Sequence, residues 1–219
     1  MPKRLNHHLE QLKKEILLLG SMVEDATNKA LLALADRRHE LATEVIEGDA
    51  VVDAREIAVE EECLKILALH QPVAADLRFV IAAMKVNNDL ERVGDLASNL
   101  AARAIYLISE PPIPIPVEID EMADSVRAML RDSLNALVNR DLQLAHKVLH
   151  ADEDVDSRHK RIYDLLQARM REQPDHIERL VQMLSVSRYL ERMADLATNI
   201  AEDVVFMVNG EVIRHRPTG

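Results

Sequence analysis

Residues 90–101 read LERVGDLASNLA, and the segment returns at residues 190–201 as LERMADLATNIA. Eight of the twelve positions are identical, and the other four exchange residues of similar size or chemistry. Upstream of this segment the offset changes from 100 to 103 residues, where Val45 and Asp49 match Val148 and Asp152. A match of this kind within one chain indicates two copies of one structural unit.

Outside the repeated segment, apolar residues recur at alternating spacings of four and three. This is the heptad pattern of helices that pack on helices. The first such run contains Leu5, Leu9, Leu12, Ile16, Leu19, Val23, Ala26, Ala30 and Ala33. We predict helices over residues 5–35, 39–69, 72–108, 117–139, 141–171 and 174–208. The segment EPPIPIP at 110–116 is incompatible with a helix and predicts a stiff connector. The predicted fold is therefore all-α, with six helices in two pseudo-symmetric three-helix bundles, 1–109 and 117–219.

Composition excludes several classes of protein. A net charge of −11, no Lys/Arg-rich run and no Trp argue against nucleic-acid binding. No apolar segment reaches the length of a membrane span, and the charged N-terminus does not read as a signal peptide. The one cysteine, Cys63, suits a reducing compartment, so we expect a cytoplasmic protein.

Acidic residues form lines beside the apolar seams. Glu91 and Asp95 are four residues apart in the first unit, and Glu191 and Asp195 repeat that spacing in the second. The preceding helices add further acids, namely Asp49, Asp53, Glu56 and Glu60 in the first unit and Asp152 and Asp156 in the second. Stacked carboxylates repel, so they require a bound cation or a solvated surface. A plain solvated face is the simpler reading, because acidic stripes are common and neighbouring arginines can form surface salt bridges.

Three stretches together resemble the signature of the PhoU family: QPVAADLR at 71–78, LERVGD at 90–95 and YLERMADLATNIAE at 189–202. The likeness covers essentially the whole chain, including the break at the proline-rich connector. It implies a non-catalytic regulator that restrains phosphate uptake and phosphate-starvation signalling. The implied partners are the ATP-binding subunit of a phosphate ABC transporter and a phosphate-sensing histidine kinase in the membrane. Some members of the family bind iron or zinc clusters through motifs of Glu or Asp, three residues, then Asp.

Carried onto this chain, that motif matches Glu91 with Asp95 and Glu191 with Asp195. On the preceding helix of the first unit, both Glu56 with Glu60 and Asp49 with Asp53 fit the spacing. In the second unit the positions that match Glu56 and Glu60 are His159 and Tyr163, which favours Asp152 and Asp156 as the carboxylate pair there.

We therefore predict a metal site between the second and third helices of each bundle. The first site is an all-oxygen set for several hard cations. The second holds fewer ions, with His159 as a nitrogen ligand that favours iron or zinc and with Arg188 opposing cation binding. Spacing alone leaves open the metal, the number of ions and whether the chain forms a homodimer.

Two other functions fit parts of the sequence. A di-iron carboxylate oxidase needs a Glu-x-x-His from each of two helices, whereas this chain has a related Asp156-x-x-His159 once. A metal-free helical adaptor is the second alternative. The chain has no GxxxxGK loop, nucleophile elbow or HExxH motif, so we predict that it is not an enzyme.

Overall fold

The computed structural model describes residues 2–210, and this part of the chain is helical without any strand. Its α-helices are α1 (Pro2–Ala35), α2 (His39–His70), α3 (Ala74–Ser109), α4 (Val117–Asn139), α5 (Leu142–Glu172) and α6 (Ile177–Asn209). The predicted all-α fold of six helices in two repeated units is confirmed. The predicted second bundle extended to residue 219, and residues 211–219 lie outside the described part.

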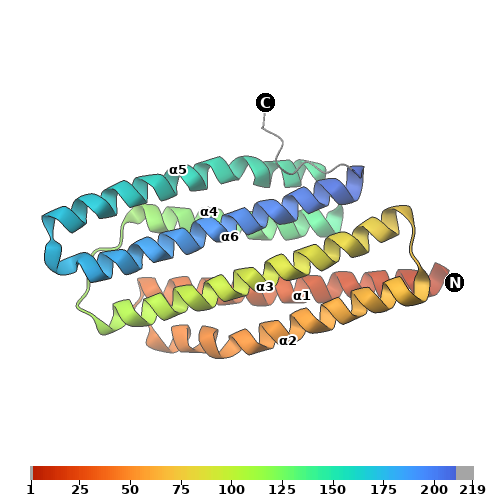
Figure 1. The fold of residues 1–219 in the computed structure, drawn as a ribbon, viewed down its shortest axis with the longest axis horizontal. Coiled ribbons are helices and arrows are strands. Elements are labelled where there is room, and N and C mark those ends of the chain that lie inside the picture. Colours follow the sequence, from red (N-terminus) through yellow and green to blue (C-terminus); the bar gives the residue numbers. More distant parts are fainter. Residues whose placement is uncertain (1, 211–219) are drawn as a thin grey trace.

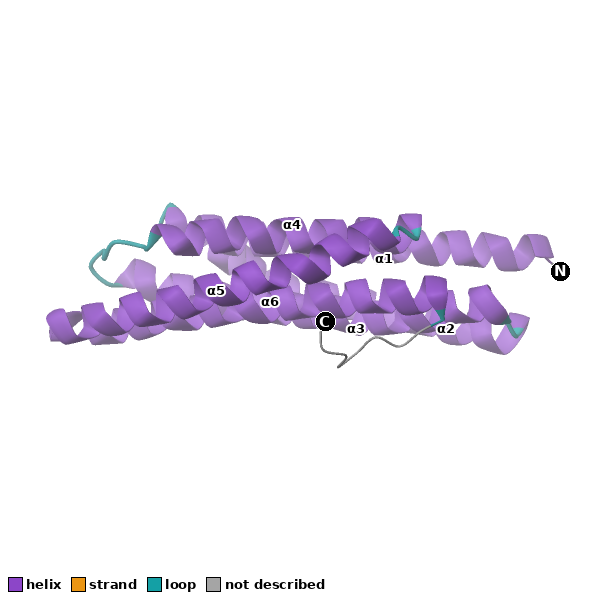
Figure 2. Cartoon of the chain, turned by 90° about the horizontal axis from the view of Figure 1, so that it is seen from above, coloured by secondary structure: helices purple, strands orange, loops and turns teal. Residues whose placement is uncertain are grey.

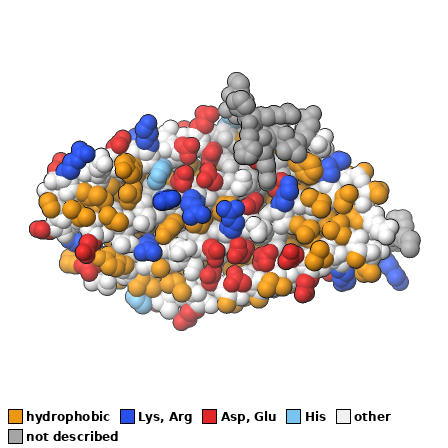
Figure 3. All heavy atoms as spheres, in the orientation of Figure 1, with side chains coloured by type: hydrophobic (Ala, Val, Ile, Leu, Met, Phe, Trp, Pro, Cys, Tyr) orange, Lys and Arg blue, Asp and Glu red, His pale blue; other side chains and the backbone are white. Residues whose placement is uncertain are grey.

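The helices form two layers (Figures 1 and 2). One layer contains α5, α6, α3 and α2, in that order across the molecule, and the other contains α4 and α1. Each three-helix unit contributes two helices to the first layer and one to the second, and the units meet where α3 packs on α6 and α1 on α4. The outward face of the four-helix layer is the face shown in Figure 3.

Two predicted helix starts were wrong, and both involve proline. Pro72 lies outside the helices, because Gln71 ends α2 in a left-handed conformation, with its N–H donating to the Leu67 carbonyl, and Val73 is extended. A residue before proline is also disfavoured in the helical conformation. Pro174 begins a short 3₁₀ turn, η1 (Pro174–His176), and α6 starts only at residue 177.

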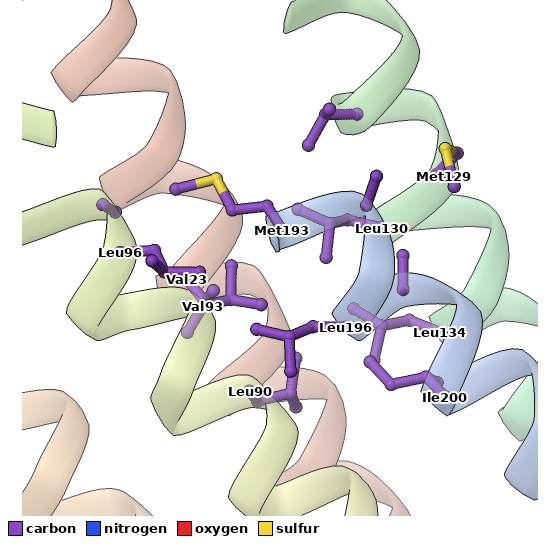
Figure 4. Close-up of a cluster of buried hydrophobic side chains, with 14 of the residues drawn as sticks. Val23, Leu90, Val93, Leu96, Met129, Leu130, Leu134, Met193, Leu196 and Ile200 are labelled. Carbon is purple, nitrogen blue, oxygen red and sulfur yellow. The ribbon is translucent and has the colours of Figure 1, made fainter. Parts of the chain in front are cut away.

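Apolar seams from both units join in one continuous core. Seven of the nine residues in the apolar run predicted for the first helix are buried, and Leu5 and Ala26 are partly buried. Figure 4 shows how the units meet, with Leu90 and Val93 of α3, Leu196 of α6 and Leu130 of α4 in one cluster. Burial of such side chains contributes roughly 1.5–3 kcal/mol each, so the apolar junction between the units is a principal source of stability.

Helix α1 approaches α4 closely at Gly20. A Cβ at this position would lie 2.5 Å from Leu134 Cδ1. A small residue there lets the leucine pack directly on the α1 backbone, so the two units approach closely at this point.

Polar contacts also join the units along α3 and α6. Lys85 Nζ lies 2.9 Å from Oδ1 of the buried Asp203. Towards the other end of the same helix pair, Arg103 Nη1 donates to Gln182 Oε1 at 3.1 Å. These contacts pair the beginning of one helix with the end of the other, so α3 and α6 run antiparallel.

Candidate functional site

The predicted ligand residues gather in two groups on the outward face of the four-helix layer. We call the group on α2 and α3 the first acidic cluster; its members are Asp49, Asp53, Glu56, Glu60, Glu91 and Asp95. The group on α5 and α6 is the second acidic cluster; its members are Asp152, Asp156, Glu191 and Asp195. Figure 3 shows acidic side chains in two groups on this face, with Lys and Arg side chains between them.

Carboxylates from α2 and α3 act on one another in the first cluster. Burial raises the pKa of Glu91 most, and the charges of Asp95 and Asp53 raise it further. Burial likewise raises the pKa of Asp49, followed by Asp95 and Asp53, while a hydrogen bond from Ser98 lowers it. Residues of the two helices that are some forty positions apart in sequence therefore share one electrostatic environment.

Glu56 is held in place by a buried asparagine. Asn87, which is 1% exposed, donates through Nδ2 to the Glu56 carbonyl oxygen and to Glu56 Oε1, each at 2.9 Å. The pKa of Glu56 is raised by burial and then by Glu60 and Asp53. Asn87 Oδ1 is buried without a hydrogen-bond partner among the described residues. The next residue, Asn88, is exposed.

In the second cluster, the side chain of Asp152 is partly buried. Burial, followed by the charges of Asp156, Asp195 and Glu191, raises the pKa of Asp152 from 3.8 to about 6. Its Oδ1 atom is buried and has no hydrogen-bond partner in the described structure. Burial also raises the pKa of Asp195, with Glu191 and Asp156 as further causes and Arg192 opposing them.

His159 occupies the place of Glu56 in the second unit. The offsets of 103 and 100 residues match Glu56 with His159 and Asn87 with Ser187. His159 Nδ1 lies 2.6 Å from Ser187 Oγ, so the repeat keeps a hydrogen bond between these two helices while both partners change. The other ring nitrogen, Nε2, is the one left for a ligand.

The carboxylate oxygens of the clusters are suitable ligands for a cation, but the side chains are not positioned to bind one. Carboxylate oxygens are the ligands of hard cations. The pKa values of Glu91 and Asp152 are raised first by burial and then by repulsion from neighbouring carboxylates, and a cation would relieve that repulsion. Within residues 2–210, however, no three His, Cys, Asp or Glu side chains are placed to hold one metal ion. Ion binding requires rotation of these side chains, and a hollow of about 500 Å³ beside His159, Glu191 and Asp195 leaves room for it.

Two further observations concern membrane-spanning helices and the single cysteine. No described helix is both long enough and apolar enough to cross a bilayer. Cys63 is a free thiol that packs in the core, and burial raises its pKa to about 12.

Comparison with protein families matches the model of the PhoU domain twice, over residues 16–104 and 119–204. The "phosphate-specific transport system accessory protein PhoU homolog" of Aquifex aeolicus is 38% identical over 213 residues, which cover 97% of this chain and 96% of that protein. The Escherichia coli accessory protein PhoU is 32% identical over 212 residues, or 97% of this chain and 88% of that protein.

Solved structures agree with these matches. The crystal structure of PhoU from Pseudomonas aeruginosa superposes with a TM-score of 0.91 at 39% identity, covering 94% of this chain and 99% of that one. The phosphate transport system regulatory protein PhoU from Streptococcus pneumoniae superposes with a TM-score of 0.87 at 31% identity, covering 95% and 99%. The similarity therefore extends through both units.

Proposed function

Because this chain belongs to the PhoU family over nearly its whole length, we propose that it is a non-catalytic regulator of a phosphate transport system. It restrains phosphate uptake and phosphate-starvation signalling. The observation that carries this proposal is the match through both units to proteins named as accessory or regulatory components of phosphate transport.

The proposed regulator acts by protein contact, with the ATP-binding subunit of the phosphate transporter and with a phosphate-sensing histidine kinase as its partners. This role places it in the cytoplasm, in keeping with its single free thiol.

Deletion of the gene tests the regulatory role. We expect phosphate uptake and the starvation response to become active in phosphate-rich medium, and the intact gene to restore repression. Tagged protein should also retain the transporter's ATP-binding subunit from a lysate of its own organism. Unchanged uptake and an unchanged starvation response in the deletion strain would remove the proposal.

We further propose that the two acidic clusters bind metal ions and differ in what they bind. The first cluster offers carboxylates only, which suits several hard cations. The second offers fewer carboxylates and the free Nε2 of His159, which shifts its preference toward iron or zinc. The support is chemical: carboxylates that raise one another's pKa values are stabilised by a shared positive charge.

Metal content separates the two clusters. Glu91→Ala with Asp95→Ala is expected to empty the first cluster alone, and Glu191→Ala with Asp195→Ala the second. The exposed acids Asp120 and Asp124 of α4 have the same spacing and serve as a matched control pair. Elemental analysis after identical iron or zinc loading is the measurement. Wild-type metal content in both cluster variants would identify the acidic faces as ordinary solvated surface.

A further inference from the structure

A pocket lies between the units, where α3 and α6 meet. It has a volume of about 380 Å³ and is lined mainly by pairs of repeat-related residues: Arg92 and Arg192, Asp95 and Asp195, Leu96 and Leu196, Asn99 and Asn199. Since α3 and α6 are antiparallel and the repeat offset here is 100 residues, these pairs meet where the two helices cross the pseudo-twofold axis. The duplication thus supplies every one of these side-chain types to the pocket twice.

Positive charge and N–H donors enter the pocket from both helices. The guanidinium of Arg92 has a loose ion pair, with Nη1 at 3.5 Å from Asp89 Oδ1. Arg192 exerts its positive charge on Asp195, whose pKa it lowers against the larger effect of burial. Asn99 uses one amide N–H on the Asp95 carbonyl, at 2.8 Å, which leaves its second N–H for a ligand. Lys and Arg side chains accordingly occupy the middle of the face in Figure 3.

The carboxylates of Asp95 and Asp195 also line the pocket and restrict which anions fit there. A pair of guanidinium groups suits an oxyanion, since planar N–H pairs match its oxygens. A carboxylate, in contrast, only accepts hydrogen bonds and repels an anion that carries no proton. An oxyanion that keeps an O–H group satisfies both, because its oxygens accept from arginine while its proton is donated to aspartate.

We propose that this pocket binds inorganic phosphate. Inorganic phosphate retains a proton at neutral pH, whereas sulfate has none and a phosphate monoester has largely lost its last proton. The mixed lining therefore discriminates among anions of similar size and charge. The proposal does not depend on the partner proteins. The pocket shares Asp95 and Asp195 with the two acidic clusters, so phosphate binding is measured on protein freed of metal.

Titration calorimetry on the full chain, freed of metal with chelator and kept at neutral pH, tests the proposal. Phosphate is expected to bind with a Kd of about 1 mM or tighter, and sulfate and glycerol phosphate at least about tenfold more weakly. Arg92→Gln with Arg192→Gln is expected to weaken phosphate binding at least about tenfold. Arg188→Gln removes one positive charge from α6, outside this pocket, and it should leave phosphate affinity within about twofold.

A second variant tests the role of the carboxylates. Asp95→Asn with Asp195→Asn is expected to abolish the preference, so that sulfate binds as well as phosphate. Helicity measured by circular dichroism confirms that each variant folds. The proposal is overturned if the wild-type chain binds neither anion, if it binds both equally, or if Arg188→Gln weakens binding as much as the paired arginine variant.

Discussion

Replacing Asp152 by Asn is expected to stabilise the folded protein at pH 7. Asp152 is charged at that pH although its pKa in the fold is raised from 3.8 to about 6, chiefly by burial and by Asp156. About two pKa units correspond to about 3 kcal/mol. Because the side chain still contacts solvent, screening reduces the gain to about 1.5 kcal/mol, which raises Tm by about 4 °C in a chain of this length.

The effect of Asp152 on the stability of the fold depends on pH. Between about pH 4 and pH 6 the folded state holds more protons on Asp152 than the unfolded state does, since only the folded pKa is raised. Stability therefore falls as pH rises through this window and stays lower above it. The asparagine variant lacks this loss, so its advantage over the wild type is present at pH 7 and disappears near pH 4.

Urea unfolding followed by circular dichroism, at several pH values between 4 and 7 and with chelator present, measures the effect. Asp154→Asn is the control, because Asp154 is exposed on the same helix and is not among the charges that raise the pKa of Asp152. Three results would contradict a destabilising charge at Asp152. These are no increase in stability for Asp152→Asn at pH 7, the same increase at pH 4, or an increase no larger than that of Asp154→Asn.

Four further substitutions concern packing and one buried hydrogen bond, and each is measured by urea unfolding at pH 7. Gly20→Ala is expected to destabilise the protein by about 1 kcal/mol, because the new Cβ meets a leucine methyl of α4 at 2.5 Å. Gly48→Ala has open space around its Cβ and should stabilise by about 0.5–1 kcal/mol; equal effects at the two glycines would contradict the close approach of α1 and α4. Lys85→Met removes the hydrogen bond to the buried Asp203 and should destabilise by about 2 kcal/mol, and an unchanged midpoint would show that this contact contributes nothing. Leu90→Ala should destabilise by about 3 kcal/mol within a single transition, whereas two separate transitions would argue against a shared core.

The helices and their buried faces were predictable from sequence. Heptad spacing requires only that one stripe of each helix be buried, and seven of the nine residues in the run predicted for the first helix are buried. The family resemblance drawn from three short motifs is confirmed by matches through both units. The helix starts predicted at Pro72 and Pro174 came two and three residues too early, because proline is accepted both in the first turn of a helix and just outside it.

The acidic residues were also found from sequence, since a spacing of four places carboxylates on one side of a helix. Their hydrogen-bond partners were missed. Asn87 and Ser187 fall among buried positions, and helical periodicity by itself does not distinguish a buried residue that hydrogen-bonds across helices from one that fills space. A comparison of the two repeats could have found them. Glu56 and Asn87 of the first unit are replaced by His159 and Ser187 in the second, so both members of the pair change together.

The helices, the duplication and the residues that each unit buries are predictable from sequence, because they follow from local periodicity and from self-similarity along one chain. How the units dock depends on the folded molecule. Heptad patterns state that a face is buried but not which face covers it, so the close packing of Gly20 on Leu134 and the crossing of α3 with α6 were not encoded in spacing. The pocket that brings Arg92 beside Arg192 arises from that crossing. It exists because two equivalent surfaces meet on one axis, which is a property of the folded molecule and not of either repeat.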